Sequence, residues 1–313
     1  MKLVTYTGKK QSSLSIGLVI QNKILDLNLS SKGKLPSNML DFISGGDDFL
    51  SIAQDLQNNS AKFELISLEE AVLKAPILNP PSLKDFFAFE EHAKNGAKRR
   101  NEELAKEWYE LPAYYKGNHR QILGPNDEIP WPFYTRKLDF ECEIACVVGK
   151  NGKSIPEEDA SKYIFGYMIF NDVSARDIQK KEMILRMGPS KSKDFANIFG
   201  PYLVTKDEVN PQKDFSLEVK VNGEVWSKGH FKDQYWGFPL MISHVSQEED
   251  IYPGDIFGSG TFYKGCGLDL DRWIQPGDIV ELEVPKLGIL KNKVGIPKSQ
   301  RELVYKKEIE IKS

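Results

Sequence analysis

Residues 139–149, DFECEIACVVG, carry the pattern on which the fold prediction depends. Successive side chains of a β-strand point to opposite faces, so alternation with a period of two predicts a strand here. One face is apolar throughout and holds Phe140, Cys142, Ile144, Cys146 and Val148. The other face becomes apolar only at Ala145 and Val147, and it begins with the carboxylates of Asp139, Glu141 and Glu143. The strand therefore carries acidic groups directly beside surface that we expect to be buried.

These alternating carboxylates indicate a cation site. Like charges at neighbouring positions repel one another, and carboxylates beside buried surface resist ionisation, so a bound cation would relieve both penalties. Ligands that are all oxygen favour Mg²⁺, Mn²⁺ or Ca²⁺ over zinc. The alternative is a half-exposed strand with an ordinary polar face, which this stretch alone does not exclude.

A second acidic segment follows the next predicted strand. Residues 163–170 are typical of a strand and lead into NDVSARD at 171–177. Rigid elements commonly position site residues at their ends, so Asp172 could supply a third carboxylate. Arg176 could bind a substrate carboxylate through two hydrogen bonds. The alternative is a helix cap by Asp172 or Ser174, with Arg176 in a surface ion pair.

Other segments carry candidate groups for catalysis. His92 lies beside Glu91 and is a natural general base near neutral pH, although a solvent-facing helix histidine is the alternative. The segment GPSKSKDF at 188–195 contains lysines that could balance a developing oxyanion, or that belong to an ordinary loop. The segment GSGT at 258–261 offers backbone N–H groups to an anion, or forms a tight turn.

The first part of the chain predicts a small domain of strands and helices. Strands are predicted at 3–6, 15–20 and 23–27, and a helix pattern at 38–56 is interrupted by Gly45-Gly46. Proline fixes its own backbone and favours extended geometry in the residue before it. The connector APILNPPS at 75–82 therefore indicates a boundary between residues 1–76 and residues 80–313.

The larger part predicts a helix followed mainly by strands. The helix pattern covers 90–108, and Asn222-Gly223 predicts a two-residue hairpin turn. The predicted strands are 140–148, 163–170, 215–221, 279–284 and 302–311. The fold class expected for the whole chain is α+β, mostly β, with mixed sheets.

Composition excludes several classes of protein. The 42 basic and 45 acidic residues among 313 leave a formal charge of -3, so a nucleic-acid partner is not expected. No long apolar run predicts a membrane span, and MKLVTYTGKK at the N-terminus lacks an apolar signal core. The three cysteines, Cys142, Cys146 and Cys266, show no CxxC spacing and fit a reducing compartment. We therefore expect a cytoplasmic protein.

The order of these segments resembles the fumarylacetoacetate hydrolase family. The strand LDFECEIACVVG is similar to the family's E-x-E metal strand, and FNDVSARDIQ to its N/D-D-x-[ST]-A-R-D-x-Q motif. GPSKSKDFA resembles its lysine segment, GSGT its late G-T turn, and RWIQPGDIVELEVPKLGILKN its closing strands. The resemblance covers most of residues 80–295. It implies a mixed β-roll catalytic domain in residues 80–313 and a small N-terminal α/β domain in residues 1–76.

The resemblance also implies a set of site residues. The metal ligands, for Mg²⁺ or alternatively Mn²⁺ or Ca²⁺, would be Glu141, Glu143 and Asp172, with Asp85 as a fourth ligand. The catalytic residues would be His92, Lys193 and Asp269. The substrate-binding residues would be Arg176, Gln179, Tyr115 and Thr261. Met183 and Phe87 stand where the family's fumarylacetoacetases have tyrosines, so a different substrate is expected.

The activity implied by the resemblance is metal-dependent hydrolysis of a carbon–carbon bond in a small β-diketo or acylpyruvate-type acid. In this scheme His92 activates water and the metal stabilises the enolate. One alternative keeps the fold and makes the protein a decarboxylase, dehydratase or isomerase of a 2-keto acid. Another is a non-catalytic protein that binds a metal or ligand. The expected partners are a small keto acid and a second copy of the chain in a homodimer.

Overall fold

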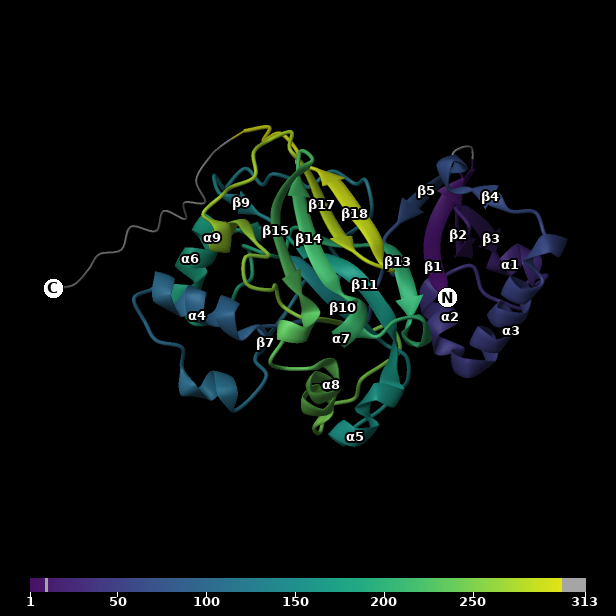
Figure 1. Ribbon diagram of the computed structural model, residues 1–313, viewed down its shortest axis with the longest axis horizontal. Coiled ribbons are helices and arrows are strands. Elements are labelled where there is room, and N and C mark those ends of the chain that lie inside the picture. Colours follow the sequence, from purple (N-terminus) through teal and green to yellow (C-terminus); the bar gives the residue numbers. More distant parts are fainter. Residues whose placement is uncertain (9–10, 300–313) are drawn as a thin grey trace, which may run out of the picture.

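The computed structural model describes residues 1–8 and 11–299 of the chain. In its N-terminal part, helices lie beside a group of antiparallel strands (Figure 1). The strands are β1 (Lys2–Gly8), β2 (Gln11–Ile20), β3 (Lys23–Asp26), β4 (Ile66–Ser67) and β5 (Ala71–Lys74). The helices are α1 (Leu27–Ser30), α2 (Met39–Ser44) and α3 (Gly46–Asn58). The predicted interruption is confirmed, because Gly46 begins α3 with a φ of 56°, a left-handed conformation that glycine adopts without steric cost.

One large sheet runs through both parts of the chain. Its strand order is β4-β3-β2-β1-β13-β11-β10-β16-β6-β7, with β5 paired to β1 and β8 to β13. The strands from the larger part are β6 (Leu83–Phe86), β7 (Tyr114–Lys116), β8 (Ile122–Leu123), β10 (Cys142–Val148), β11 (Ile164–Asp172), β13 (Asn197–Thr205) and β16 (Ile256–Gly258). Since Leu3 of β1 pairs with Leu203 of β13, the N-terminal strands extend the sheet. The domain boundary at residues 76–80 stays a prediction.

A second sheet packs over the central strands of the first. Its order is β15-β14-β17-β18, formed by β14 (Ser216–Val221), β15 (Glu224–His230), β17 (Ile279–Val284) and β18 (Gly288–Lys293). The Asn222-Gly223 hairpin between β14 and β15 is confirmed, with φ values of 52° and 80°. The short pair β9 (Leu138–Asp139) and β12 (Ser174–Ala175) lies apart from both sheets. The α+β, mostly β prediction is confirmed.

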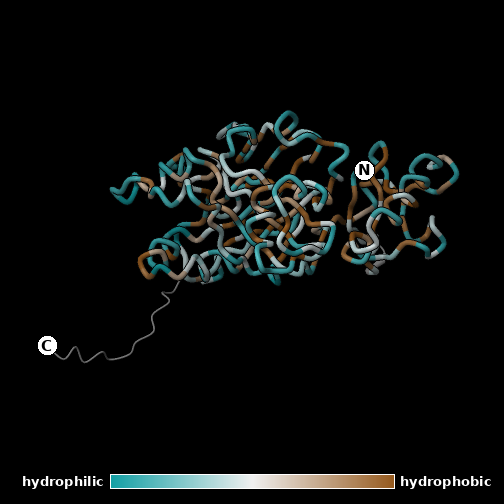
Figure 2. Tube along the Cα trace, turned by 90° about the horizontal axis from the view of Figure 1, so that it is seen from below, coloured by the Kyte–Doolittle hydropathy of each residue, from teal (hydrophilic) through white to brown (hydrophobic). Residues whose placement is uncertain are grey.

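Strand β10 is buried on both faces, so the alternative of a half-exposed strand is wrong. Ile144 and Cys146 share a core with Val219 and Leu282 of the second sheet. The opposite face packs into another core, in which Ala145 and Val147 join Leu3, Leu18 and Phe170. Figure 2 shows hydrophobic segments running through the interior of the larger part. Any acidic side chain on this strand is therefore held away from solvent.

Helices of the larger part lie around the sheets. They are α4 (Glu90–Arg99), α5 (Glu157–Ala160), α6 (Arg176–Ile184), α7 (Pro211–Asp214), α8 (Phe238–Ser246) and α9 (Gly267–Leu270). Helices α4, α6 and α9 gather at the end of the molecule opposite the N-terminal part (Figure 1). The predicted helix at 90–108 is too long. It ends at Arg99 because Asn101 takes a left-handed φ of 59°, and only a 3₁₀ turn follows at Lys106–Tyr109.

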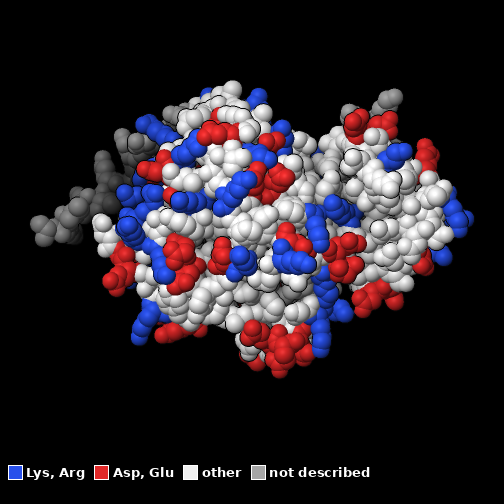
Figure 3. All heavy atoms as spheres, viewed as in Figure 1, with Lys and Arg blue, Asp and Glu red and all other residues white. Residues whose placement is uncertain are grey.

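The predicted strand at 302–311 and the predicted absence of a membrane span concern different parts of the chain. The predicted strand at 302–311 lies outside the described residues. Within residues 1–8 and 11–299, no helix is both long and apolar enough to cross a membrane. On the face in Figure 3, basic and acidic side chains are interspersed. The cellular compartment stays a prediction.

Candidate metal centre

Four buried carboxylates meet at one end of the large sheet. Asp85 comes from β6, Glu143 from β10 and Asp172 from the end of β11, while Glu141 immediately precedes β10. One oxygen from each of the four lies within 4.8 Å of the others. They meet because β11, β10, β16 and β6 are successive neighbours in the sheet, with Glu143 paired to Phe170 and Asp85 to Gly258.

The donor atoms of this cluster fit a hard divalent cation. Within the part of the chain that the structure describes, Glu143 Oε1 and Asp172 Oδ1 are buried and receive no hydrogen bond. A buried polar atom without a partner is costly, and a cation bound to the cluster would supply the missing partner. Carboxylate oxygens are the ligands that Mg²⁺, Mn²⁺ and Ca²⁺ prefer. Asp85, Glu141, Glu143 and Asp172 could therefore hold such an ion.

The electrostatics of the cluster lead to the same expectation. Burial raises the pKa values of Asp85 and Glu143 well above their ordinary range, and the neighbouring carboxylates add to this effect. Burial likewise raises the pKa of Asp172 to about 6, despite the nearby Lys193. For Glu141 burial is outweighed by Lys193 and Arg176, which lower its pKa. A bound cation would stabilise the ionised form of all four groups.

Two basic side chains are part of the centre. The Lys193 ammonium contacts carboxylate oxygens of both Glu141 and Asp172. The Arg176 guanidinium donates from Nη2 to Glu141 Oε1 at 2.8 Å and from Nε to Asp139 Oδ2 at 2.7 Å. Lys193 and Arg176 are only 4% and 7% exposed, so the alternative of a surface pair for Arg176 is wrong. Asp172 does not cap α6 either, because the residue at that position is Ala175.

A histidine–aspartate pair stands beside the carboxylates. His92 lies near the start of α4, and its Nδ1 is 2.7 Å from Oδ2 of Asp269 in α9. Asp269 also accepts hydrogen bonds from Asn95 Nδ2 at 2.7 Å and from the Lys264 backbone N–H at 3.0 Å. Although burial opposes it, these hydrogen bonds lower the pKa of Asp269. An ionised Asp269 accepts a hydrogen bond from an imidazole proton on Nδ1, which leaves Nε2 of His92 as the candidate base.

The remaining predicted residues also lie around the carboxylates. The Tyr115 hydroxyl donates to Asp172 Oδ2 at 2.7 Å, and Gln179 Oε1 accepts from Arg176 Nη1 at 2.9 Å. The Thr261 hydroxyl donates to the carbonyl of Cys142 at 3.0 Å. Just before Thr261, the Gly260 N–H donates to Glu143 Oε2 at 2.9 Å and to Asp85 Oδ1 at 3.2 Å. The GSGT segment thus binds carboxylates of the protein itself.

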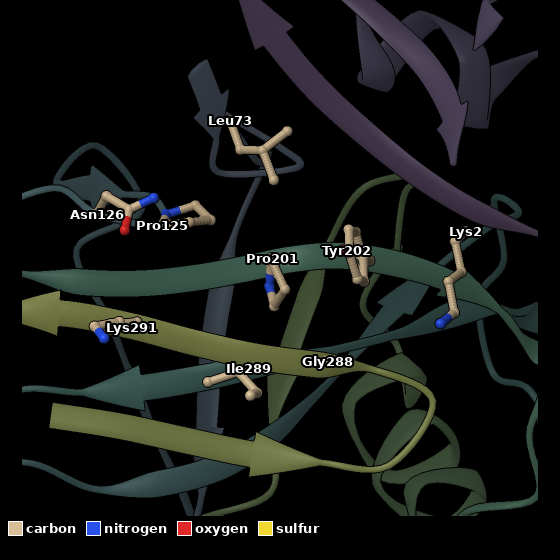
Figure 4. Close-up of a pocket in the computed structure, with 9 residues that line it drawn as sticks. All are labelled: Lys2, Leu73, Pro125, Asn126, Pro201, Tyr202, Gly288, Ile289 and Lys291. Atoms are coloured by element: carbon tan, nitrogen blue, oxygen red, sulfur yellow. The ribbon is translucent and has the colours of Figure 1, made fainter. Parts of the chain in front are cut away.

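A separate groove lies away from this centre. It has a volume of about 450 Å³ and is lined by Lys2, Leu73, Pro125, Asn126, Pro201, Tyr202, Gly288, Ile289 and Lys291 (Figure 4). None of the candidate ligands or catalytic residues lines it. The groove is therefore distinct from the carboxylate cluster.

The sequence of the chain also matches the model of a known protein family. The family model described as "Fumarylacetoacetate (FAA) hydrolase C-terminal" matches residues 83–295, which include all the residues of the centre. The chain belongs to the fumarylacetoacetate hydrolase family.

Relatives of this family member carry several different names. It is 30% identical over 307 residues to the oxaloacetate tautomerase YisK of Bacillus subtilis (strain 168), covering 92% of this chain and 99% of the relative. A fumarylacetoacetate hydrolase of Exiguobacterium antarcticum aligns with a TM-score of 0.73 and 26% identity, covering 96% of this chain and 100% of the other. A maleylpyruvate hydrolase of Sphingobium, in complex with manganese(II) and pyruvate, aligns with a TM-score of 0.74, 22% identity and coverage of 96% and 100%.

Sequence reasoning missed two residues in the centre of this fumarylacetoacetate hydrolase family member. Asp139 was recognised as acidic but not as the partner of Arg176, and its side chain also accepts backbone hydrogen bonds from Gly267 and Leu268. Asn95 was not singled out, although it follows His92 by three residues and so lies on the same face of α4. That spacing was the available signal for Asn95. No local signal marked the pairing of Asp139 with Arg176, because the two residues lie 37 positions apart.

Proposed function

We propose that this protein is a divalent-metal-dependent enzyme that interconverts the keto and enol forms of a small 2-keto acid of the oxaloacetate type. One observation carries the proposal: the hydrogen-bonded pair of His92 and Asp269 stands beside four buried carboxylates suited to a hard cation. Tautomerisation needs one group that moves a proton to or from carbon, and this pair supplies it. The name of the Bacillus subtilis relative, which aligns over 92% of this chain, supports the substrate class.

Each residue of the centre has a separate role in this proposal. A divalent cation held by Asp85, Glu141, Glu143 and Asp172 would act as a Lewis acid toward the oxygens of the keto acid. Asp269 orients the imidazole and keeps its proton on Nδ1, so Nε2 of His92 removes a proton from the carbon beside the carbonyl. The oxygen gains a proton from solvent to complete the enol. In the reverse direction the oxygen gives its proton back to solvent, and Nε2 of His92 returns a proton to the carbon. Arg176 fixes Glu141 and Asp139 in place.

A carbon–carbon hydrolase is the second candidate, and one contact favours it. Hydrolysis also needs a donor for the oxyanion that forms when water attacks a carbonyl. Because Arg176 can only donate, Gln179 must accept through its amide oxygen, which leaves the amide NH₂ for another acceptor. His92 would then take its proton from water. The name of the Exiguobacterium hydrolase supports this alternative.

The test is a substrate panel with Mg²⁺ and with Mn²⁺. We expect metal-dependent loss of the enol absorbance of oxaloacetate without pyruvate formation. Cleavage products from acylpyruvates without tautomerase activity would favour the hydrolase, and pyruvate from oxaloacetate would identify a decarboxylase. His92→Ala should lower turnover by at least about 10²-fold. His230→Ala changes an exposed histidine on β15 and is the matched control. Normal turnover in His92→Ala excludes it as the base.

We also propose that the protein forms a homodimer. A run of exposed apolar side chains follows the part of α6 that carries Arg176 and Gln179, at Met183, Ile184, Leu185 and Met187. Contiguous apolar patches of this kind commonly mark protein–protein contacts. Light scattering after size-exclusion chromatography should give twice the mass of the chain. Substitution of Ile184 and Leu185 by serine should give the single mass, and a monomeric wild type contradicts the proposal.

A further inference from the structure

A buried thiol adjoins the pair of His92 and Asp269. Cys266 is fully buried, forms an isolated backbone bridge with Glu141 and lies three residues before Asp269. Ligand atoms of His92, Cys266 and Asp269 lie within 4.8 Å of one another. These three groups come from α4 and from the segment that begins α9, whereas the carboxylate cluster is built on the strands.

The donor chemistry of this group differs from that of the acidic centre. It combines sulfur, nitrogen and oxygen, the ligand types that zinc accepts in proteins, with bonds of about 2.3 Å to sulfur and about 2.0 Å to nitrogen. Ligand atoms that lie within 4.8 Å of one another can reach one ion after small movements of their side chains. A hard ion such as Mg²⁺ prefers the oxygen atoms of the other cluster.

The charges around Cys266 also favour a cation. Burial raises the pKa of its thiol, and Asp139, Asp269 and Glu141 raise it further against the opposing effect of Arg176. A divalent cation would offset the surrounding carboxylates and ligate the thiolate form of Cys266.

The other two cysteines lack this environment. Cys142 and Cys146 lie on the face of β10 that packs into the hydrophobic core, and they belong to neither group of candidate metal ligands. Both are fully buried, like Cys266. They therefore serve as matched controls for any effect of a buried thiol as such.

We propose that His92, Cys266 and Asp269 form a second, inhibitory metal site that binds borderline-soft divalent cations such as Zn²⁺. The site includes the proton-moving pair, so the inference rests on the proposed function. On binding, the Cys266 thiol releases its proton to solvent, and the imidazole moves its proton from Nδ1 to Nε2 as Nδ1 becomes a ligand. With its proton on Nε2, His92 no longer acts as a base, so turnover stops while the acidic centre keeps its own ion.

The experiment uses the full chain with excess Mg²⁺, to which Zn²⁺ or Cd²⁺ is added. We expect loss of turnover, and with Cd²⁺ the ultraviolet charge-transfer band of a thiolate ligand, saturating at one ion per chain. Cys266→Ser should remove the band and raise the Zn²⁺ concentration for half inhibition at least about tenfold, relative to its own uninhibited rate. Cys142→Ser and Cys146→Ser should keep both responses.

Several outcomes overturn the proposal. Inhibition without a thiolate band means that the ion enters only the acidic centre. A band that persists in Cys266→Ser assigns the sulfur ligand to another cysteine. If Cys266→Ser fails to fold, X-ray absorption of the zinc-loaded wild type decides: a sulfur neighbour at about 2.3 Å supports the site, and a shell of only oxygen and nitrogen excludes it. If no keto acid is turned over, the proposed function fails, while the band and the absorption spectrum still test the site.

Discussion

Nδ1 of His92 lies 2.7 Å from Oδ2 of Asp269, and the same carboxylate is held by Asn95 and by the backbone of Lys264. The carboxylate is thus fixed on three sides, and it fixes in turn which imidazole nitrogen carries the proton. The contact joins α4 to α9 across 177 residues of sequence. The orientation of His92 therefore depends on the contact between α4 and α9, and not on α4 alone.

The first prediction concerns this contact. Asp269→Asn keeps the shape of the side chain but offers an amide in place of a carboxylate, so the imidazole tautomer is no longer fixed. We expect turnover to fall by at least about 10²-fold, the usual range for loss of general acid–base catalysis. Metal content, measured by elemental analysis, should not change. Asp271→Asn is the control, since its side chain is 77% exposed. Loss of metal together with activity contradicts the assigned role.

The second prediction concerns Glu143, whose Oε1 has no hydrogen-bond partner among the described residues. Glu143→Gln should abolish metal retention, and with it the stabilisation that a bound ion gives, about 2.7 kcal/mol at a metal concentration of 100 times Kd. The metal-free variant should be at least as stable as the metal-free wild type, because the substitution removes one of the four carboxylates that repel one another. Thermal unfolding with and without Mg²⁺ measures both effects.

A matched variant separates this role from a general effect of losing a carboxylate. Glu281→Gln changes a glutamate on β17 of the second sheet, where its partner is Lys291 at 2.9 Å. It should keep the full increase in melting temperature on addition of Mg²⁺. An undiminished increase in Glu143→Gln would mean that Glu143 is not a ligand.

The parts of the site that could be predicted are those with a local signal. The period of two in residues 139–149 fixes which side chains share a face, and both cores around β10 confirm it. The helix end at Arg99 was missed because the left-handed turn at Asn101 is a single backbone choice within a helix-favouring segment. Contacts such as Arg176 with Asp139 depend on the pairing of β9 with β12, which no local pattern specifies. The positions of Asp85 and Asp269 came only from the family resemblance.

The third prediction concerns pH and the metal-free protein. The pKa of Asp172 is raised to about 6, and those of Asp85 and Glu143 are raised as well. These groups hold protons in the folded state that the unfolded chain loses near its ordinary pKa of about 4. The metal-free protein should therefore lose stability as the pH rises from about 4 through 6. The lowered pKa of Glu141 adds little change in this window, because its contribution is already complete above about 4.

Metal should reverse this trend, because the ion binds the ionised carboxylates and displaces their protons. Affinity should rise with pH up to and through 6. Urea unfolding at several pH values measures how the unfolding free energy changes with pH, once in chelator and once in Mg²⁺. Calorimetry in buffers of different ionisation enthalpy counts the protons that are released when the metal binds. Parallel slopes with and without metal would show that the carboxylates are not the binding site.

The fourth prediction concerns Arg176, which is buried between Asp139 and Glu141. Arg176→Met removes the cation from between Asp139 and Glu141, and loss of one partner of a buried ion pair typically costs about 3–5 kcal/mol of unfolding free energy. The midpoint of urea unfolding should therefore fall without a change in slope.

Arg272→Met is the matched control for this substitution. Arg272 also pairs with a glutamate, Glu224, but the two side chains are 42% and 64% exposed, so water replaces the lost ion pair. The methionine can keep part of the packing of Arg272 against the Trp226 ring. We expect a much smaller loss of stability in this variant. If the two variants lose equal amounts, the cost of Arg176→Met is a general effect of shortening an arginine. The cluster around Glu141 then tolerates its negative charge without the guanidinium, and Lys193 alone must be sufficient to balance it.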